Sequence, residues 1–300
     1  MDTVDTSVEL SELAALLRVV RFDVSKRGVA TVVLDRPGRG NSWTSRMNAE
    51  YRALLHALDA DPAVRVVVVT GAGRSFCVGA DSRALVGEAD EAGERNGAAA
   101  RRHPADGLPV PPDPRPEWAA DLAWQCALRI PVVAAVNGAC AGVALALVAY
   151  SDIRFAMTGA KVTAATSRLG LPVEYGLSWI LPRLVARGHA TDLLLSGRVV
   201  STDFLGDIGF FNAVYPPEEF ETRVREYAEL LAAASPQAVA AAKSQLGDDL
   251  LGGDPASSVR RGKELTERMM RAADYREGVA ALVERRDPVF GDRRDGTERE

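Results

Sequence analysis

Residues 64–82 read VRVVVVTGAGRSFCVGADS, and residues 130–144 read IPVVAAVNGACAGVA. In both stretches a run of apolar, mostly β-branched residues is followed by a turn that contains glycine. Such runs indicate strands buried on both faces, which is typical of parallel sheets covered by helices. Glycine directly after a strand indicates a tight turn or a close approach of the backbone to another group. The two stretches therefore predict an α/β protein and mark the two turns as candidate functional segments.

The segments around these strands complete an α/β pattern. Runs rich in β-forming residues at 19–24 and 30–34 flank a short turn at 26–28 and predict a hairpin. Apolar residues at helical spacing predict a helix over 44–58, and a further strand is predicted at 153–157. Strands and helices in this order favour a parallel sheet with right-handed crossovers.

Four parts are expected along the chain. They are an N-terminal extension at 1–18, an α/β core at 19–215 with a variable loop at 83–116, a helical subdomain at 216–290 and a charged tail at 291–300. The helical subdomain is predicted to hold helices at 220–233, 236–245, 259–273 and 275–285. The variable loop is rich in proline, and its composition fits a mobile lid and a disordered insertion equally well.

Composition excludes several classes of protein. The chain has 300 residues and a formal net charge of −5, whereas a nucleic-acid scaffold needs a basic face. Its three cysteines form no CxxC pair and its three histidines are far apart, so we expect neither disulfides nor a metal site. The acidic N-terminus lacks the basic region of a secretory signal, and no uninterrupted apolar stretch of ~20 residues could span a membrane. A cytoplasmic protein is expected.

The first glycine-rich turn also resembles the start of a dinucleotide-binding fingerprint. Its sequence at 71–76 is GAGRSF, so the third glycine position holds Phe76, and the turn does not lie in the first βα unit. A nicotinamide-linked reductase is therefore discounted.

The two turns resemble those of the enoyl-CoA hydratase/isomerase (crotonase) family when read with four other motifs. These are LDRP at 34–37 with Asn41, EYGLSWILPR at 174–183, REGVA at 276–280 and ERR at 284–286. The motifs follow the order and spacing of the family from about Val20 to Phe290. The resemblance implies the ClpP/crotonase-like spiral fold of ββα units, with a C-terminal helical subdomain that supports trimers or dimers of trimers.

The resemblance also implies acyl-CoA thioester substrates and a common chemistry. Family members stabilise the enolate of the thioester with two backbone N–H groups, and by position these belong here to Ala80 and Val143. Donors fixed before the charge develops are worth ~3–4 kcal/mol each. Valine keeps the N–H but adds bulk where relatives have a smaller residue. Coenzyme A is part of the substrate, so no separate cofactor is expected.

Family hydratases use two glutamates, and both are absent here. The corresponding positions are Ala146 and Thr166, and no acidic residue lies between 139 and 151 or between 161 and 173. Paired carboxylates allow one group to act as base and the other as acid, so hydration by that route is doubtful.

Glu174 lies where isomerases of the family carry a single base. Isomerisation of a Δ3 to a Δ2 enoyl-CoA needs one group that removes a proton from C2 and returns one to C4, within walls that Tyr175, Leu177 and Trp179 could supply. Alternatively, Glu174 occupies the first turn of a helix, where the dipole favours it. We therefore prefer an isomerase, with a hydratase as the first alternative and a CoA-thioester binding protein with little catalysis as the second.

Several residues are expected to contact coenzyme A, since arginine suits its phosphates. They are Arg36, Arg39, Asn41, Ala80, Asp81 and Arg285. Asp81 also fits a helix N-cap, and each arginine also fits an ordinary surface charge. The resemblance places Arg285 near the ligand of a neighbouring subunit in a homotrimer or a dimer of trimers.

Overall fold

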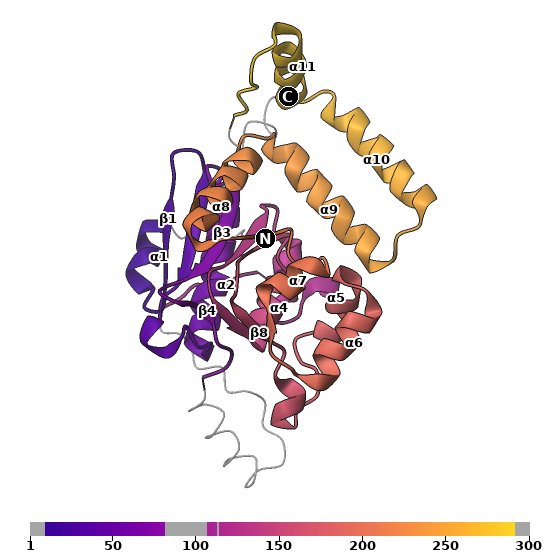
Figure 1. Ribbon diagram of the computed structural model, residues 1–300. Helices are drawn as coiled ribbons and strands as arrows, with labels where there is room; N and C mark the ends of the chain where they lie inside the picture. The colour runs from indigo at the N-terminus through magenta and orange to yellow at the C-terminus, as the bar shows by residue number, and fades with distance from the viewer. Residues whose placement is uncertain (1–9, 82–106, 113, 292–300) are drawn as a thin grey trace.

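The computed structural model describes residues 10–81, 107–112 and 114–291 (Figure 1). Its larger sheet has the strand order β1-β2-β3-β5-β7-β10, in which only β1 runs antiparallel to its neighbour. The strands are β1 (Val20–Val24), β2 (Val29–Leu34), β3 (Val66–Gly71), β5 (Val132–Val136), β7 (Ile153–Met157) and β10 (Ala213–Tyr215). The β-branched runs form β3 and β5 in the middle of the sheet, where helices cover both faces.

A second, smaller sheet has the strand order β4-β6-β8-β9. Its strands are β4 (Ser75–Cys77), β6 (Ala139–Ala141), β8 (Lys161–Thr163) and β9 (Val200–Ser201), and β4, β6 and β8 run parallel. Three times in succession the chain leaves a strand of the larger sheet, turns, and enters the smaller sheet, as β3–β4, β5–β6 and β7–β8. This repetition is the expected spiral of ββα units.

The helices between the strands fill the space around the two sheets. They are α1 (Leu10–Leu16), α2 (Ser45–Ala60), α4 (Val143–Ala149), α5 (Leu177–Leu184), α6 (Arg187–Ser196) and α7 (Thr202–Asp207), with short 3-10 segments η1 (Pro37–Arg39), η2 (Pro116–Trp118), η3 (Ala123–Ala127) and η4 (Thr166–Leu169). All seven residues of α4 are buried. A helix that is apolar on every side belongs in the interior, and α4 is the central helix of the main core.

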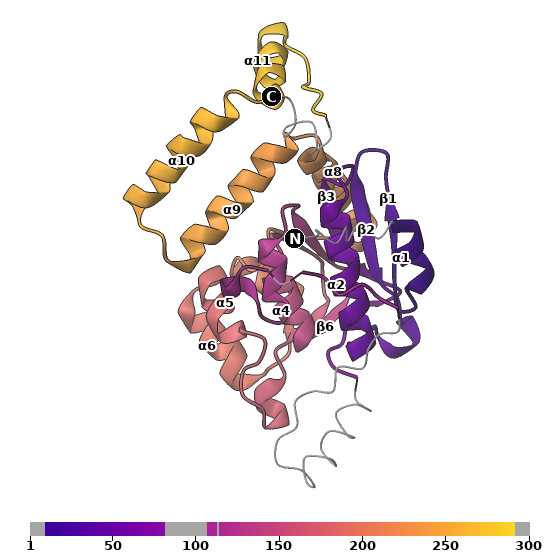
Figure 2. The same ribbon diagram turned by 180° about the vertical axis from the view of Figure 1, so that it is seen from behind.

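The C-terminal part consists of four helices, α8 (Pro217–Ala232), α9 (Pro236–Gly252), α10 (Pro255–Met269) and α11 (Ala273–Glu284). Helix α8 packs Phe220 and Val224 against Val68 and Phe155 on the outer face of the larger sheet. Helices α9, α10 and α11 extend beyond the core as an arm in both views (Figures 1 and 2). No residue of α10 is buried, and the one buried residue of α11 is Ala281.

Most expected elements are confirmed within a few residues. The boundary at residue 18 is wrong for the described residues, because α1 inserts a fully buried Leu13 into the main core. The Glu50 carboxylate also accepts hydrogen bonds from the backbone N–H groups of Arg18, Val19 and Val20. Most of the variable loop at 83–116 lies outside the described residues. Among those described, no helix combines the length and apolar character needed to cross a bilayer.

Candidate active site

The smaller sheet brings the two glycine-containing turns together. Strand β4 pairs with β6 in parallel register, so the segments that follow them, 79–81 and 141–143, lie side by side. A Cβ on Gly79 would lie 3.1 Å from the carbonyl oxygen of Ala141. Gly79 and Gly142 both have positive φ angles, of +95° and +55°. Glycine is therefore required at these positions by backbone conformation and by the close approach of the two turns.

The N–H groups of Ala80 and Val143 are available for a ligand. Trp43 donates its N–H to the Gly79 carbonyl at 2.7 Å and accepts from the Asp81 N–H at 3.1 Å, so the N–H of the intervening Ala80 points away from Trp43. Val143 is the first residue of α4, where N–H groups have no partner within the helix. Within the described residues neither N–H has a protein acceptor, and the helix dipole at Val143 favours negative charge.

Ala146 and Thr166, the positions that the resemblance assigns to the two hydratase glutamates, lie next to these turns. Ala146 is fully buried in the first turn of α4, where its N–H bonds to the Gly142 carbonyl. Thr166 begins η4, and its Oγ1 is buried without a hydrogen-bond partner among the residues described. Neither position carries a carboxylate, since Thr166 has a hydroxyl and Ala146 a methyl group.

Glu174 lies in the loop before α5, and its carbonyl accepts the N–H of Leu177 at 3.1 Å. The alternative that it occupies the first turn of a helix is therefore wrong. Its side chain is exposed and borders a pocket of about 400 Å³ that is also lined by Asp121, Tyr150 and Tyr175. Of the other expected walls, Leu177 is buried in the main core and Trp179 packs edge-on against Trp118.

Tyr150 is a residue of this pocket that the sequence reasoning missed. Its N–H bonds to the Ala146 carbonyl at 3.0 Å, which places it one helical turn beyond the position of the first hydratase glutamate. The residue as a whole is only 6% exposed, and it borders the pocket. The hydroxyl lies so close to Gly176 that a Cβ there would be 2.3 Å away. Burial raises the pKa of Tyr150, so its phenol stays protonated.

Three of the residues expected to contact coenzyme A are bonded to one another. The Arg36 guanidinium donates to the Asp81 carboxylate at 3.1 Å and to the Ser42 carbonyl at 2.7 Å. Asn41 is fully buried, accepts from the Arg36 N–H at 2.8 Å and donates to the carbonyls of Ala72 and Ser75. A direct contact between Asn41 and a ligand is therefore wrong, because every polar atom of its side chain is already bonded. These side chains shape the loop before the Ala80 turn.

Arg39, Arg74 and Arg285 are differently placed. Arg39 is exposed in η1, and its guanidinium has no ion-pair partner among the described residues. Arg74 is exposed in the next turn, and a Cβ on Gly73 beside it would lie 3.3 Å from the Pro37 Cβ, so the two turns are in contact. Arg285 ends α11, at the far end of the molecule from β4 in both views (Figures 1 and 2). One chain therefore does not bring Arg285 to the Ala80 turn.

The cysteines beside the two turns are not nucleophiles. Cys77 and Cys140 are buried free thiols, as small apolar side chains would be. Burial raises the pKa of Cys77 to about 11 and raises that of Cys140 as well. Both thiols stay protonated at neutral pH, and only the thiolate is reactive.

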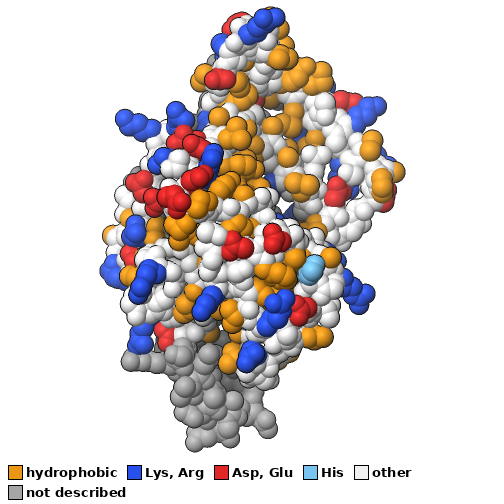
Figure 3. Space-filling model, viewed as in Figure 1, with side chains coloured by type: hydrophobic (Ala, Val, Ile, Leu, Met, Phe, Trp, Pro, Cys, Tyr) orange, Lys and Arg blue, Asp and Glu red, His pale blue; other side chains and the backbone are white. Residues whose placement is uncertain are grey.

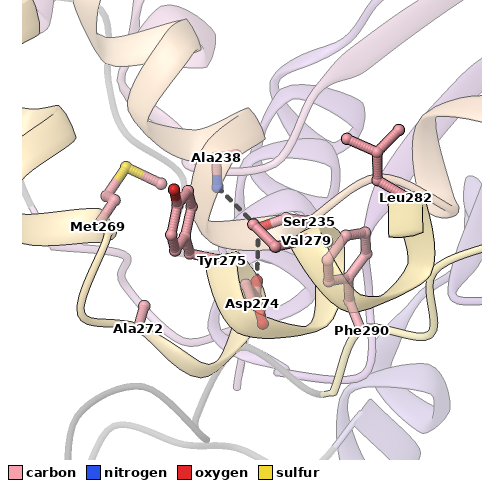
Figure 4. Close-up of a pocket in the computed structure, with 10 residues that line it drawn as sticks. Ser235, Ala238, Met269, Ala272, Asp274, Tyr275, Val279, Leu282 and Phe290 are labelled. Carbon is pink, nitrogen blue, oxygen red and sulfur yellow. Dashed lines mark hydrogen bonds between the residues drawn. The ribbon is translucent and has the colours of Figure 1, made fainter. Parts of the chain in front are cut away.

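A second pocket, of about 330 Å³, lies where α9 begins, α10 ends and α11 passes (Figure 4). Ser235 donates to the Asp274 carboxylate and accepts from the Ala238 N–H, which fixes the start of α9. The remaining lining is mostly apolar, from Met269, Tyr275, Val279, Leu282 and Phe290. Leu282 and the neighbouring Val283 are more than three quarters exposed. Hydrophobic side chains gather on the surface at this end of the molecule (Figure 3).

Comparison with known proteins agrees with the geometry of the paired turns. The model of the enoyl-CoA hydratase/isomerase family matches residues 24–102 and 117–293. A "Probable enoyl-CoA hydratase" of Rhodobacter capsulatus is 32% identical over 90% of this chain and 97% of its own length. The 1,2-epoxyphenylacetyl-CoA isomerase of Escherichia coli K12 is 31% identical over 88% of this chain and 95% of its own. The crystal structure of enoyl-CoA hydratase from Bacillus anthracis superposes with a TM-score of 0.79 at 27% identity, covering 91% of this chain and 99% of that one. The chain therefore belongs to the enoyl-CoA hydratase/isomerase family and has the crotonase fold.

Proposed function

We propose that this protein stabilises the enolate of an acyl-CoA thioester and isomerises a Δ3 to a Δ2 enoyl-CoA, with Glu174 as the single base. The observation that carries the proposal is the pair of free N–H groups on Ala80 and Val143, held side by side by β4 and β6. A thioester oxygen between them would gain negative charge as C2 loses a proton. Fixed donors of this kind stabilise the transition state by ~3–4 kcal/mol each.

Glu174 supports isomerisation more than hydration by the two-glutamate route. Neither Ala146 nor Thr166 carries a group that acts as a general acid or base at neutral pH, whereas Glu174 is a carboxylate at a pocket beside α4. One carboxylate that removes the C2 proton and returns it to C4 completes the reaction without a second acid. Atoms balance because the substrate and product are isomers.

Three observations favour other functions. Asp121 borders the same pocket as Glu174, and two carboxylates around one pocket are the minimum for acid–base addition of water. The curated relatives above include a hydratase as well as an isomerase. The exposure of Glu174, by contrast, favours a CoA-thioester binding protein, since a base in contact with bulk water has no environment that tunes it.

The proposal extends to binding of the CoA moiety and to assembly. Arg39 and Arg74 are exposed in adjacent turns, where a fork of N–H donors suits phosphate. Arg285 would reach the site only from a neighbouring copy. The arm of α9–α11, with Leu282 and Val283 exposed, supports assembly of a homotrimer or a dimer of trimers. Light scattering on the purified protein would give a trimer or hexamer mass, and a monomer mass would reject the assembly.

The test is a time course of absorbance and mass with a 3-enoyl-CoA and, separately, a 2-enoyl-CoA. Isomerisation gives the conjugated 2-enoyl-CoA without a change in mass, and Glu174→Gln is expected to lower kcat ~10²–10⁴-fold. Glu218→Gln, an exposed glutamate at the start of α8, is the matched control and should leave kcat unchanged. A gain of one water from the 2-enoyl-CoA, sensitive to Asp121→Asn, would establish hydration instead. Binding without turnover would establish the binding protein.

A further inference from the structure

Two walls of the pocket beside Glu174 come from segments that are far apart in the chain. Ala120 and Asp121 follow η2, whereas residues 174–176 precede α5. A base in one wall acts on a substrate held against the other only when the two walls keep a fixed separation. Residues that set this separation therefore influence the chemistry without contacting the substrate.

A tryptophan lies directly behind each of these walls. The Ala120 N–H donates to the Trp118 carbonyl at 2.8 Å, and the Trp179 N–H donates to the Gly176 carbonyl at 2.9 Å. The two indole rings meet edge to face, with their centroids 6.2 Å apart and their planes at 79°. Each ring is therefore one main-chain hydrogen bond away from a wall residue, and the contact between the rings links the two walls.

Other helix residues hold each ring from outside the pair. The Arg183 guanidinium carbon lies 4.1 Å from the centroid of the Trp179 ring, and Arg183 also donates to the Trp179 carbonyl at 2.7 Å. Helix α9 lies against Trp118, because a Cβ on Gly247 would be 3.6 Å from the Trp118 Cζ2. The ring pair is therefore packed between α5 and α9, and a shift of one wall is resisted by the other.

Trp118 contributes its surface rather than its polar atom. The residue is 1% exposed, and its Nε1 is buried without a hydrogen-bond partner among the residues described. Burial of an N–H group without an acceptor costs free energy. The favourable contribution of this indole is therefore its packing, and its edge-to-face contact with Trp179 is an arrangement that aromatic rings prefer.

We propose that Trp118 is a positioning residue, and that its contact with Trp179 fixes the wall that carries Glu174 relative to the wall that carries Asp121. The proposal rests on the proposed isomerisation, because it assigns to Trp118 the placement of the proposed base. Misplacement of a reacting group by ~1 Å lowers a rate by ~10²-fold. Since Trp118 touches no part of the proposed CoA site, its loss should affect kcat more than KM.

The test combines hydrogen exchange with steady-state kinetics on the wild-type protein, Trp118→Ala, Trp179→Leu and Trp124→Ala. Trp124 is the matched control, since it is a buried indole of the same segment whose ring stacks on His56 rather than on α5. Trp179→Leu removes the same contact from its half-buried side, so the test does not depend on the folding of Trp118→Ala. Circular dichroism gives the folded fraction by which each kcat is corrected.

Hydrogen exchange reports the wall directly, because the Leu177 N–H bonds to the Glu174 carbonyl. Trp118→Ala and Trp179→Leu should each raise the exchange rate of residues 174–178 by ~2–10-fold, the change expected from the loss of one aromatic pair. Trp124→Ala should leave the exchange of this segment unchanged. No increase in either of the first two variants, or an equal increase in Trp124→Ala, would overturn the link between the walls, whether or not the protein is an isomerase.

The kinetics test the positioning of Glu174. Trp118→Ala and Trp179→Leu should lower kcat for a 3-enoyl-CoA by ~10–10²-fold with KM changed less than ~3-fold, and Trp124→Ala should keep both constants. In a Glu174→Gln background, Trp118→Ala should lower kcat no further, because residues that act as a unit are not additive. An unchanged kcat in Trp118→Ala, or an equal loss in both backgrounds, would overturn the positioning role. Raised exchange in a protein that turns over no 3-enoyl-CoA would overturn the isomerase and keep the link between the walls.

Discussion

The two ends of helix α4 are held in place by different means. At its N-terminal end the contacts come from the main chain, because Gly142 donates its N–H to the Thr163 carbonyl at 3.0 Å and β6 pairs with both β4 and β8. At its C-terminal end they come from side chains. Gln125 Nε2 donates to the Leu147 carbonyl, Cys126 Sγ approaches the Tyr150 carbonyl, and Lys243 pairs with Asp152.

This difference separates the two tasks of the candidate site. An N–H group held by strand pairing keeps its position whatever side chain it carries, so Val143 can replace a smaller residue without loss of the donor. The other end holds the polar side chains of Tyr150 and, across the pocket, Glu174, and it is fixed by contacts that substitutions can change. The proposed charge stabilisation uses the end of α4 that main-chain contacts hold, and the polar side chains of the pocket lie at the end that side-chain contacts hold.

The largest expected effect follows from a substitution at the N-terminal end of α4, which main-chain contacts hold in place. Gly142 has φ +55° and ψ −120°, a conformation that a β-branched residue cannot adopt without strain. Gly142→Val should displace the Val143 N–H from the position of the oxyanion and lower kcat/KM ~10²–10³-fold, the loss typical of one missing donor. Steady-state kinetics on the enoyl-CoA that proves to be the substrate measures it.

Gly159→Val is the matched control for this substitution. Gly159 also has a positive φ, of +74°, but it lies in the turn between β7 and β8, where an added Cβ would meet no atom within 4 Å. The control should lose stability through backbone strain and keep its kcat/KM. If both variants lose activity equally, the N–H of Val143 is not specifically responsible, and the contrast between the two ends of α4 fails.

The sequence predicts the N-terminal end of α4, held by main-chain contacts, better than the C-terminal end, held by side-chain contacts, for a physical reason. Glycine after a strand is a local signal, so the Ala80 and Val143 turns can be located from neighbouring residues alone. Asn41 was misassigned because a buried amide that braces a loop and an exposed amide that binds a ligand look alike in a sequence. The individual strands of the smaller sheet were not located from the residues, since strands of three residues carry little periodicity.

Contacts at the other end of α4 join segments that are far apart in the chain. Tyr51 donates to the side chain of Gln125 at 2.5 Å across 74 residues, and Lys243 pairs with Asp152 across 91 residues. The Asp152 carboxylate accepts the Val132 N–H at 2.7 Å and so fixes the start of β5. Its partner Lys243 could not be inferred, since only the folded chain brings α9 against η3 and the end of α4.

A second prediction concerns this ion pair. Lys243 Nζ lies 2.6 Å from the Asp152 carboxylate and also donates to the carbonyls of Gln125 and Ile130, and its side chain is 8% exposed. Lys243→Met leaves these acceptors without a donor and should lower the free energy of unfolding by ~2–3 kcal/mol, below the 3–5 typical of fully buried pairs because Asp152 is partly exposed. Urea unfolding measures the change.

Arg223→Met provides the comparison with an exposed pair. Arg223 bonds Glu219 one turn away on α8, and both side chains are about half exposed. Such pairs contribute ~0.3–0.5 kcal/mol, so this variant should unfold close to the wild-type midpoint. A Lys243→Met variant as stable as Arg223→Met would show that side chains do not hold the C-terminal end of α4.

The smallest expected effect is a pH dependence of the free energy of unfolding, and it arises at His56 beside η3. His56 stacks on Trp124 of η3 at 5.2 Å, and burial together with the nearby Arg52 lowers its pKa to about 4. In the unfolded chain the pKa is ~6.5, so as the pH falls below that value the unfolded state gains a proton that the folded state refuses. The free energy of unfolding is therefore highest above pH ~6.5 and should fall by ~1–2 kcal/mol towards pH 4, after allowance for the partial exposure of the ring.

Urea unfolding at pH 7 and pH 4.5 should show this loss in the wild-type protein and in His189→Phe, whose histidine is exposed. His56→Phe keeps an aromatic ring on Trp124 but cannot take up the proton, and it should show a smaller loss. An equal loss in His56→Phe would assign the pH dependence to carboxylates elsewhere and would show that His56 does not contribute to it.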